Sequence, residues 1–306
     1  MRYRTPPRML VAAAAAVTGG LVAAPFTAGT ARAAEVAHPA HRSHAATAGP
    51  MPAGGVDHEV NVTRFCGDRS FYRAPGSIVG NGVFGSNVFQ CVHVLGHADG
   101  FQITRSHQRG LGWELESFPR VDIGYNIFGV GTSDDPFPST MGHLRGMTVS
   151  VSTHWSQRRR QVADDASDMP ITAGPLDGPA AWRAELMLWL HWSPRVAVGT
   201  LAAVRACGVT WDLNWWVTGG TGTDHWNYLQ ARDTAGQSGL QHCEVGPILR
   251  FFETHDLAGD RVHPGGHAMI RLRWRPAGME WGFECWLACR GDAVRSYTVS
   301  ISSERR

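Results

Sequence analysis

The sequence predicts an all-β domain, a sandwich or barrel built from many short strands. In the segment 147–154, apolar and polar side chains alternate from Met147 to Ser152, which is the period of a half-buried strand. Glycine-rich segments such as Thr-Gly-Gly-Thr-Gly at 218–222 separate the runs and indicate turns. The chain after residue 57 suits one domain, because all-β domains reach about 200–250 residues without splitting.

The expected elements are strands in succession, with one exception. The exception is a helix at 244–257, where Val245, Ile248, Leu249 and Phe252 recur at helical spacing. The expected strands are residues 77–84, 90–95, 100–104, 147–154, 185–192, 209–217, 268–275, 280–286 and 296–302.

The first 33 residues have the pattern of a secretory signal peptide. Three arginines precede an apolar run at 9–22, and Ala-Arg-Ala at 31–33 fits the cleavage pattern. The alternative is an uncleaved membrane anchor, but two glycines interrupt the run and it is shorter than the ~20 residues of a span. We therefore expect a secreted, extracellular protein.

Residues 34–57 are rich in Ala, His, Pro and Gly, which predicts a disordered linker ahead of a catalytic domain at 58–306. The linker histidines leave weak metal binding open as an alternative to a solvated tail. Cleavage after residue 33 removes four of the 28 basic residues and no acid, leaving 24 against 26, a net charge of −2. That balance gives no support for a nucleic-acid or membrane partner.

Six cysteines follow the signal segment, an even number that favours disulfides in an exported chain. Six cysteines allow 15 pairings, and spacing alone leaves them open, although Cys285 is a candidate partner for Cys207 or Cys243. The spacing matches no zinc site, so we expect neither a metal nor another cofactor.

Two carboxylates lie inside apolar, alternating segments, and each precedes a Trp by two residues. Glu185 begins Glu-Leu-Met-Leu-Trp, and Glu284 lies in Gly-Phe-Glu-Cys-Trp. Strand alternation places Glu185 with Met187 and Trp189 on one face, and Glu284 with Trp286. The structural alternatives are that each glutamate is a strand-edge carboxylate in a salt bridge with an arginine, and that the two tryptophans belong to the core.

A pair of carboxyl groups beside flat aromatic rings is typical of the active site of a glycosidase. Retaining enzymes hold the two groups about 5–5.5 Å apart, one as nucleophile and the other as acid/base. Neighbouring strands lie about 4.8 Å apart, so we expect the two glutamates on neighbouring strands of one face.

These motifs resemble glycoside hydrolase family 12, the secreted β-1,4-endoglucanases and xyloglucanases. The segment at 185–189 is similar to the family's nucleophile strand, E-I-M-I-W, and 282–286 to its acid/base strand, G-F-E-x-W. Supporting similarities lie at 80–85 with Gln90 and Cys91, at 117–119, at 193–199 and at 208–211. The resemblance extends over about residues 62–303.

The resemblance implies Glu185 as nucleophile, Glu284 as acid/base and Asp168 as the carboxyl that hydrogen-bonds the nucleophile, with Asp165 as fallback. It also implies a jelly-roll sandwich of two curved antiparallel sheets, concanavalin A-like, with the site on the concave sheet. A Cys66–Cys91 disulfide is implied too. The implied substrate-binding residues are Phe84, Asn81, Met187, Trp189 and Trp286.

Several positions depart from the family pattern. Phe84 replaces a Trp, and Pro170 and the lost aromatics alter the strand of the assisting Asp. We expect a monomeric, retaining endo-β-1,4-glucanase acting on cellulose-like, mixed-linkage or xyloglucan polymers. The alternative is a non-catalytic or weakly active β-sandwich that binds carbohydrate.

Overall fold

A computed structural model describes residues 58–67, 69–85, 88–108, 115–126, 130–137, 140–156, 160–174, 182–193, 199–217, 227–255 and 269–302. The chain divides into two units, Met1–His41 and Arg42–Arg306, and every described residue lies in the second. The expected signal peptide and linker lie outside the described residues. Within the described part, no helix has the length and apolarity needed to cross a membrane.

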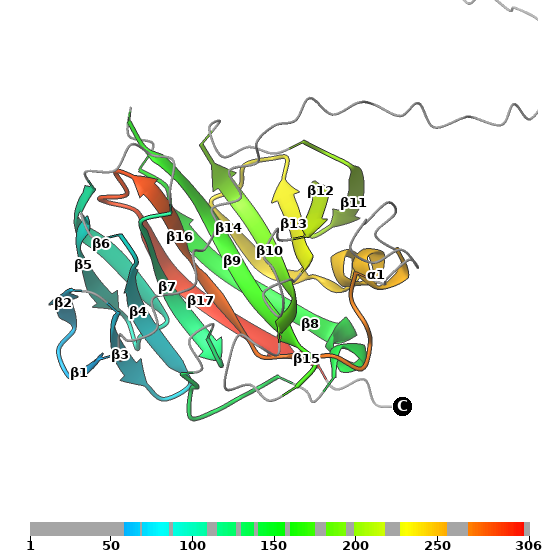
Figure 1. The fold of residues 1–306 in the computed structure, drawn as a ribbon, viewed down its shortest axis with the longest axis horizontal. Coiled ribbons are helices and arrows are strands. Elements are labelled where there is room, and N and C mark those ends of the chain that lie inside the picture. Colours follow the sequence, from blue (N-terminus) through cyan, green and yellow to red (C-terminus); the bar gives the residue numbers. More distant parts are fainter. Residues whose placement is uncertain are drawn as a thin grey trace, which may run out of the picture. The chain divides into compact units, whose positions relative to one another are not determined.

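The described chain forms two stacked β-sheets (Figure 1). The larger sheet has 11 strands in the order β1-β3-β4-β7-β16-β9-β10-β13-β12-β11, with β15 beside β9; the smaller has six, in the order β14-β8-β17-β6-β5-β2. Only the β1/β3 and β10/β13 ladders are parallel among the described strands. The larger sheet comprises β1 (His58–Val60), β3 (Ser70–Ala74), β4 (Ser77–Val83), β7 (Ser117–Gly124), β9 (Val162–Thr172), β10 (Trp182–Trp192), β11 (Ala202–Ala206), β12 (Val209–Val217), β13 (Asn227–Asp233), β15 (Arg275–Pro276) and β16 (Gly278–Leu287).

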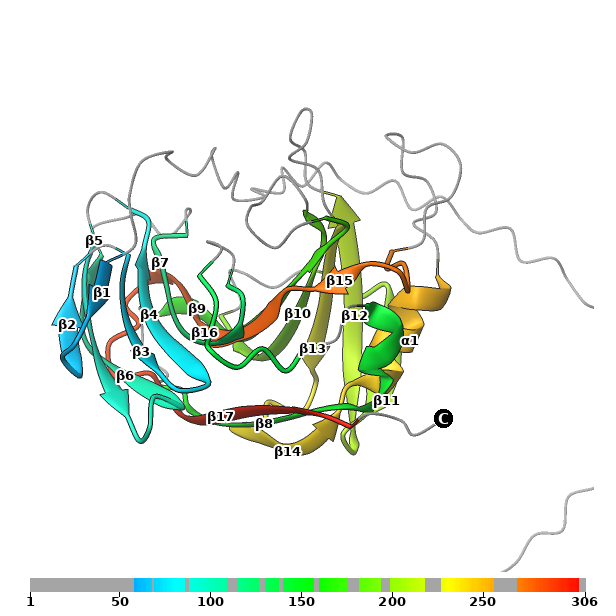
Figure 2. The ribbon, with the colours of Figure 1, turned by 90° about the horizontal axis from the view of Figure 1, so that it is seen from below.

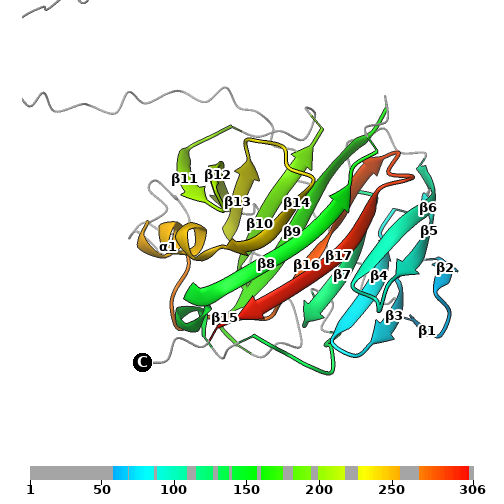
Figure 3. The same ribbon diagram turned by 180° about the vertical axis from the view of Figure 1, so that it is seen from behind.

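The smaller sheet covers one side of the larger one. Figure 2 shows the larger sheet curving, with β8, β14 and β17 along its convex side, and Figure 3 shows the smaller sheet from behind. A short 3-10 helix, Met141–Gly146, precedes β8, and α1 (Gly246–Thr254) follows β14. The smaller sheet comprises β2 (Arg64–Cys66), β5 (Val88–Leu95), β6 (Gly100–Gln108), β8 (Met147–His154), β14 (Gly239–Glu244) and β17 (Ala293–Ile301).

The hydrophobic core lies between the sheets, because alternate residues of each strand point there. Leu186, Leu188 and Leu190 of β10 are fully buried in it, as are Phe283 and Cys285 of β16. The intervening residues of β10 and β16 therefore face the concave side of the larger sheet. This two-sheet sandwich confirms the predicted fold class.

Some predicted elements match the structure closely and others do not. Strands β8 and β12 have the predicted bounds, and α1 lies inside the predicted helix. The strand predicted at 268–275 is wrong: residues 269–274 form bends and turns, and the strand β15 begins only at Arg275. Strand β9, which the alternation pattern did not identify and only the family resemblance implied, is a central strand of the larger sheet.

Pro170 lies inside β9, a position that normally loses a ladder hydrogen bond. The amide of Ala277 donates to the carbonyl of Pro170 at 2.9 Å, so this side of Pro170 faces the junction of β15 and β16. In an antiparallel ladder the N–H and C=O of one residue point the same way. The donor missing from Pro170 therefore falls where the neighbouring strand is already interrupted.

Three disulfides link the six cysteines. Cys66–Cys91 joins β2 to β5, which confirms the pairing that the resemblance implied. Cys207 pairs with Cys243, and Cys285 pairs with Cys289 only four residues away. The suggested pairing of Cys285 with Cys207 or Cys243 is therefore wrong, because β16 ends in a tight turn that brings Cys289 back to it.

Candidate active site

The strands β16, β9 and β10 lie side by side and carry the candidate catalytic carboxyls on the concave face. Glu185 on β10 lies opposite Pro170 of β9, and Glu284 on β16 lies opposite Asp164 of β9. The two glutamates therefore lie on strands that flank β9. The expectation that they lie on neighbouring strands is wrong, because β9 separates β10 from β16. Both face the same side, because the residues adjacent to each in sequence enter the core.

Asp168 occupies the middle strand between the two glutamates. Burial raises the pKa of Asp168 well above its ordinary value, and the negative charges of Glu185 and Glu284 raise it further. Asp168 thus lies within electrostatic range of both glutamates and tends to keep its proton. The fallback residue, Asp165, faces the core instead, where its carboxylate accepts a hydrogen bond from the Trp281 indole at 2.8 Å.

Tyr228 is a further neighbour of Glu185. It lies on β13 directly across from Glu185, and its hydroxyl donates a hydrogen bond to the Glu185 carboxylate. Burial raises the pKa of Tyr228 well above 10.0, and the charges of Glu185 and Glu284 add to the shift. This contact was not predicted, because β13 lacks an apolar alternation that would identify it as a strand.

Asp164 faces Glu284 on the concave side. Burial raises the pKa of Asp164 well above 3.8, and the charge of Glu284 and a hydrogen bond between the two carboxyls raise it further. Burial also raises the pKa of Glu284, while the bond from Asp164 lowers it. The pair of carboxyls therefore tends to keep a proton near neutral pH.

A buried ion-pair cluster supports the site from the side of β7. The Arg120 guanidinium lies 3.0 Å from the Asp122 carboxylate and 2.7 Å from that of Glu280, and all three side chains are buried. Glu280 in turn lies opposite Asp168 across the β16/β9 ladder. The charge of Arg120 lowers the pKa of Asp168, partly offsetting the carboxylates around it.

Apolar side chains form a second cluster on the concave face, beside Glu185. Met187 and Trp189 pack with Ala166, and Trp192 and Tyr228 lie against them. Met187 and Trp189 are nearly fully buried, so Trp192 is the more open ring of this cluster. The β10/β9 ladder shifts register between Trp189 and His191, which brings Trp192 to this face against simple alternation.

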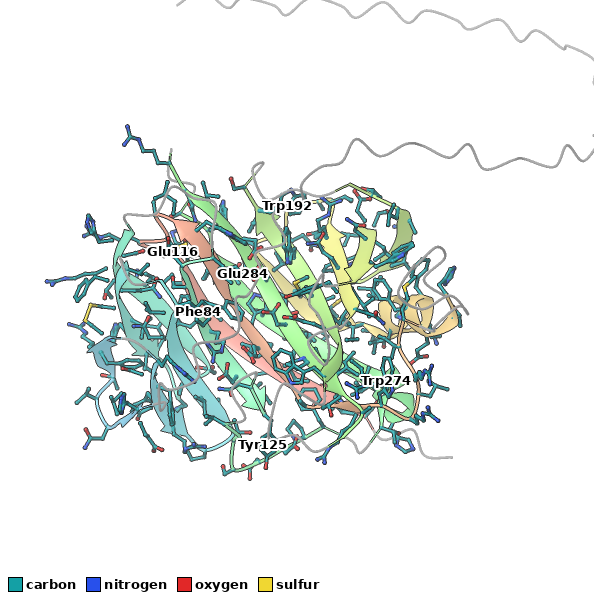
Figure 4. The ribbon with its side chains drawn as sticks, viewed as in Figure 1. Phe84, Glu116, Tyr125, Trp192, Trp274 and Glu284 are labelled. Atoms are coloured by element: carbon teal, nitrogen blue, oxygen red, sulfur yellow. A yellow bond between two sulfur atoms is a disulfide. The ribbon has the colours of Figure 1, made fainter. Side chains whose placement is uncertain are left out.

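In the view of Figure 4, the aromatic residues Phe84 and Trp192 lie on either side of Glu284. Phe84 follows β4 and is 37% exposed. Trp286 is half-buried, but it follows a register shift between Cys285 and Leu287, so the alternation that grouped it with Glu284 ends just before it.

Asn81 does not lie with the other predicted substrate-binding residues. Its side chain is fully buried, and its amide donates to the carbonyls of Gly67 and Gln90, both at 3.0 Å. The Gln90 amide donates to the Asn81 carbonyl at 2.8 Å. Alternation along β4 turns Gly80 and Gly82 to the concave face and Asn81 to the opposite one, so we remove Asn81 from the substrate-binding set.

Searches with the sequence found no matching family model and no matching curated protein. Comparison of the structure did find similar proteins. The endoglucanase cel12A from Rhodothermus marinus has 23% identity and a TM-score of 0.62, covering 79% of this chain and 99% of its own. A metagenome-derived glycoside hydrolase family 12 endoglucanase has 22% identity and a TM-score of 0.63, covering 79% and 98%.

The similarity extends to a second activity within the same group of structures. A family 12 xyloglucanase from Bacillus licheniformis has 14% identity and a TM-score of 0.60, covering 78% of this chain and 100% of its own. All three proteins are matched along almost their whole length. The chain therefore has the fold of the family 12 glycoside hydrolases.

Proposed function

We propose that this protein is a secreted glycoside hydrolase, a retaining endo-β-1,4-glucanase that cuts internal linkages of a β-glucan chain. The observation that carries the proposal is the placement of Glu185 and Glu284 on one concave face, with Asp168 between them. The endoglucanases and the xyloglucanase with the same fold support a β-1,4-linked glucan backbone as the substrate class.

The proposed reaction uses the side chains of this face in two steps. Glu185 attacks the anomeric carbon while Glu284 gives its proton to the departing glycosidic oxygen. Glu284 then removes a proton from water, and the resulting hydroxide displaces Glu185 from the sugar. Retention of configuration follows from the two successive displacements.

The neighbours of each glutamate suit its role. Glu185 must be ionised to attack, and the Tyr228 hydroxyl stabilises its carboxylate. We assign Asp168 the role of holding a proton near Glu185 and orienting it. Glu284 must be protonated to act as an acid, and its burial favours the neutral form.

Aromatic rings on the same face would hold the sugars by stacking. Phe84 and Trp192 are the rings we assign to this task, with Trp286 as a further candidate. Met187 and Trp189 form a buried apolar cluster against which Trp192 packs. A purely carbohydrate-binding sandwich is the weaker alternative, because stacking on rings alone gives no reason to bury several carboxyls together.

The test is hydrolysis by Glu185→Gln and Glu284→Gln variants. The wild-type protein should release reducing ends from barley β-glucan, carboxymethylcellulose or xyloglucan more readily than from xylan, and proton NMR of the first products should show the β-anomer. Each variant should lose activity on the polymer by about 10²-fold or more, because each removes a group that acts in the transition state.

The matched control is Glu244→Gln, which changes an exposed glutamate of the other sheet in the same way. Its turnover should equal that of the wild type. Turnover unchanged in either active-site variant, or first products of the α-anomer, would contradict the proposed mechanism.

A further inference from the structure

The Cys285–Cys289 disulfide closes a turn directly after Glu284, yet the reaction proposed above does not use it. Both cysteines are fully buried, and they are separated by four positions in the sequence. The turn is irregular: β16 and β9 shift register between Cys285 and Leu287, and Ala288 has a φ of 64°, in the left-handed region. A non-glycine residue in that region costs free energy and persists where the surrounding structure imposes it. The link therefore holds a turn that the chain does not adopt easily by itself.

The length of the closed loop indicates that overall stability is not the main benefit of this link. A disulfide stabilises a fold mainly by restricting the unfolded chain, and the restriction grows with the number of residues in the loop. The Cys66–Cys91 and Cys207–Cys243 links span 25 and 36 positions, so each restricts the unfolded chain more than Cys285–Cys289 does. The position of the short link beside Glu284 therefore points to a local role.

Strand pairing around Glu284 is less complete than along the first half of β16. Among the described residues, the ladder with β7 has pairs at 278–282 and again at Cys285, but none at Phe283 or Glu284. The residue of β7 that would face Phe283 in this register is Pro119, which has no N–H to donate. The ladder with β9 continues through Glu284 but shifts register just beyond Cys285. Glu284 is therefore paired on one side only, close to the point where that pairing becomes irregular.

The other end of the disulfide lies in a well-anchored turn. The carbonyl of Cys289 accepts a hydrogen bond from the amide of Asp292 at 3.2 Å. Gly291 and Asp292 are each bonded to the backbone of Ile103 on β6, both at 2.9 Å. The Asp292 carboxylate also accepts a bond from the Ser156 amide at 2.7 Å. The disulfide therefore ties the end of β16 to a turn that is fixed on the smaller sheet.

We infer that Cys285 and Cys289, joined as a disulfide, are positioning residues that hold the Glu284 carboxyl against the glycosidic oxygen it protonates. The inference rests on the proposed role of Glu284 as acid/base. Because Cys285 is the next residue, a tether on its side chain restricts the backbone from which Glu284 projects. A misplacement of about 1 Å can cost about 10²-fold in rate, so loss of the tether should affect the reaction more than the fold.

The experiment compares substrates that differ in how much they need an acid. A 2,4-dinitrophenolate group leaves a sugar without being protonated, whereas a phenolate or a sugar oxygen needs the proton of Glu284. In Cys285→Ala/Cys289→Ala, kcat/KM on 2,4-dinitrophenyl β-cellotrioside should stay within about twofold of the wild type, because this first displacement needs no acid. On phenyl β-cellotrioside and soluble β-glucan, kcat/KM should fall about 10-fold or more, since a general acid contributes about 10²–10⁴-fold.

The matched control is Cys207→Ala/Cys243→Ala, which removes the link between β14 and the turn after β11. It should destabilise the fold more, because its loop is longer, and should leave the ratio of the two aryl-substrate kcat/KM values unchanged. Equal losses on both aryl substrates in Cys285→Ala/Cys289→Ala, or no loss on either, would overturn the inference. Cys285→Val/Cys289→Ala, which refills part of the buried space, should give the same result and decides the matter if the alanine pair does not fold.

A measurement without turnover separates this inference from the proposed function. In the folded Cys285→Ala/Cys289→Ala variant, the amides of residues 283–287 should exchange hydrogen about tenfold faster than in the wild type, while those of β13 keep their rates. This result is expected even if the wild type hydrolyses no β-glucan. Unchanged exchange at 283–287 would refute the tether, and a local increase together with an inactive wild type would refute only the hydrolase.

Discussion

The two faces of β9 place neighbouring aspartates in opposite chemical settings. Asp165 faces the core, where the Trp281 indole N–H donates to its carboxylate at 2.8 Å. Asp164 faces the concave side, where it interacts with another carboxyl, that of Glu284, and with the Glu284 backbone N–H. Both are fully buried, and burial is the first cause of the raised pKa of each.

The difference shows what separates a structural carboxyl from a functional one in this sheet. On the core face a donor is built in, so the hydrogen bond of the side chain is satisfied within the fold. On the concave face carboxyls gather with few donors, an arrangement that costs stability and supplies protons for chemistry. Changes on the two faces should therefore be distinguishable by what they alter.

The largest effect that we expect on the core face comes from Phe283→Ala. Phe283 is fully buried, with the rings of Phe101 and Trp155 each 6.2 Å from its own. Loss of the ring should lower the free energy of unfolding by about 3–5 kcal/mol, measured by urea denaturation. The turnover of the folded protein should change little, although Glu284 is the next residue. A large fall in turnover at unchanged stability would break the distinction between the faces.

A second effect concerns the dependence of stability on pH. The pKa of Asp165 is about 7 in the folded protein, against an ordinary 3.8, chiefly because of burial. The folded state therefore holds a proton that the unfolded chain releases above pH 3.8. The resulting stability is complete below that pH and is lost as the pH rises towards 7, by up to roughly 4 kcal/mol.

Asp165→Asn should remove this share of the pH dependence, because an amide does not titrate and can still accept the bond from Trp281. Urea unfolding at pH 4, 6 and 8 measures the slope for the wild type and the variant. Equal slopes in the two proteins would show that Asp165 does not hold a proton in the folded state.

The smallest of these effects belongs to the concave face. Tyr228→Phe deletes the hydroxyl that donates to Glu185. Hydrogen bonds to charged groups contribute about 1.5–3 kcal/mol, so kcat should fall about 10- to 100-fold at nearly constant stability. Tyr297→Phe is the matched control, because the Tyr297 hydroxyl is buried on the core side and has no hydrogen-bond partner among the described residues. If both variants behave alike, the contact with Glu185 is not catalytic.

The parts of the fold that the sequence predicted are those with one polar and one apolar face. Strand β8 alternates from Met147 to Ser152, and β10 places Leu186, Leu188 and Leu190 on one side, so the period alone identifies these strands. The alternation pattern did not identify strand β9, because both of its faces are buried and one of them carries carboxyls. Its run of Asp residues and its proline resemble a loop when the partners are not known.

The sequence did not predict side-chain direction correctly where a shift of one residue decides which face a side chain points to. Asn81 lies between two glycines, so its motif does not indicate which of the three faces the concave side. Trp192 faces that side only because of the irregularity between Trp189 and His191. Asp164 and Tyr228 became visible as neighbours of the glutamates only when the pairing of β9, β13 and β16 was known.

The order of the strands also has a consequence for the making of this protein. Strand β16 lies between β7 and β9 in the middle of the larger sheet, yet among the described strands only β17 follows it in the chain. Until residue 287 has been synthesised, β7 and β9 lack the strand that joins them, and Glu284 is missing or unplaced. A nascent or truncated chain therefore lacks the proposed acid/base, and folding must wait for contacts between segments far apart in sequence, which are slow to form.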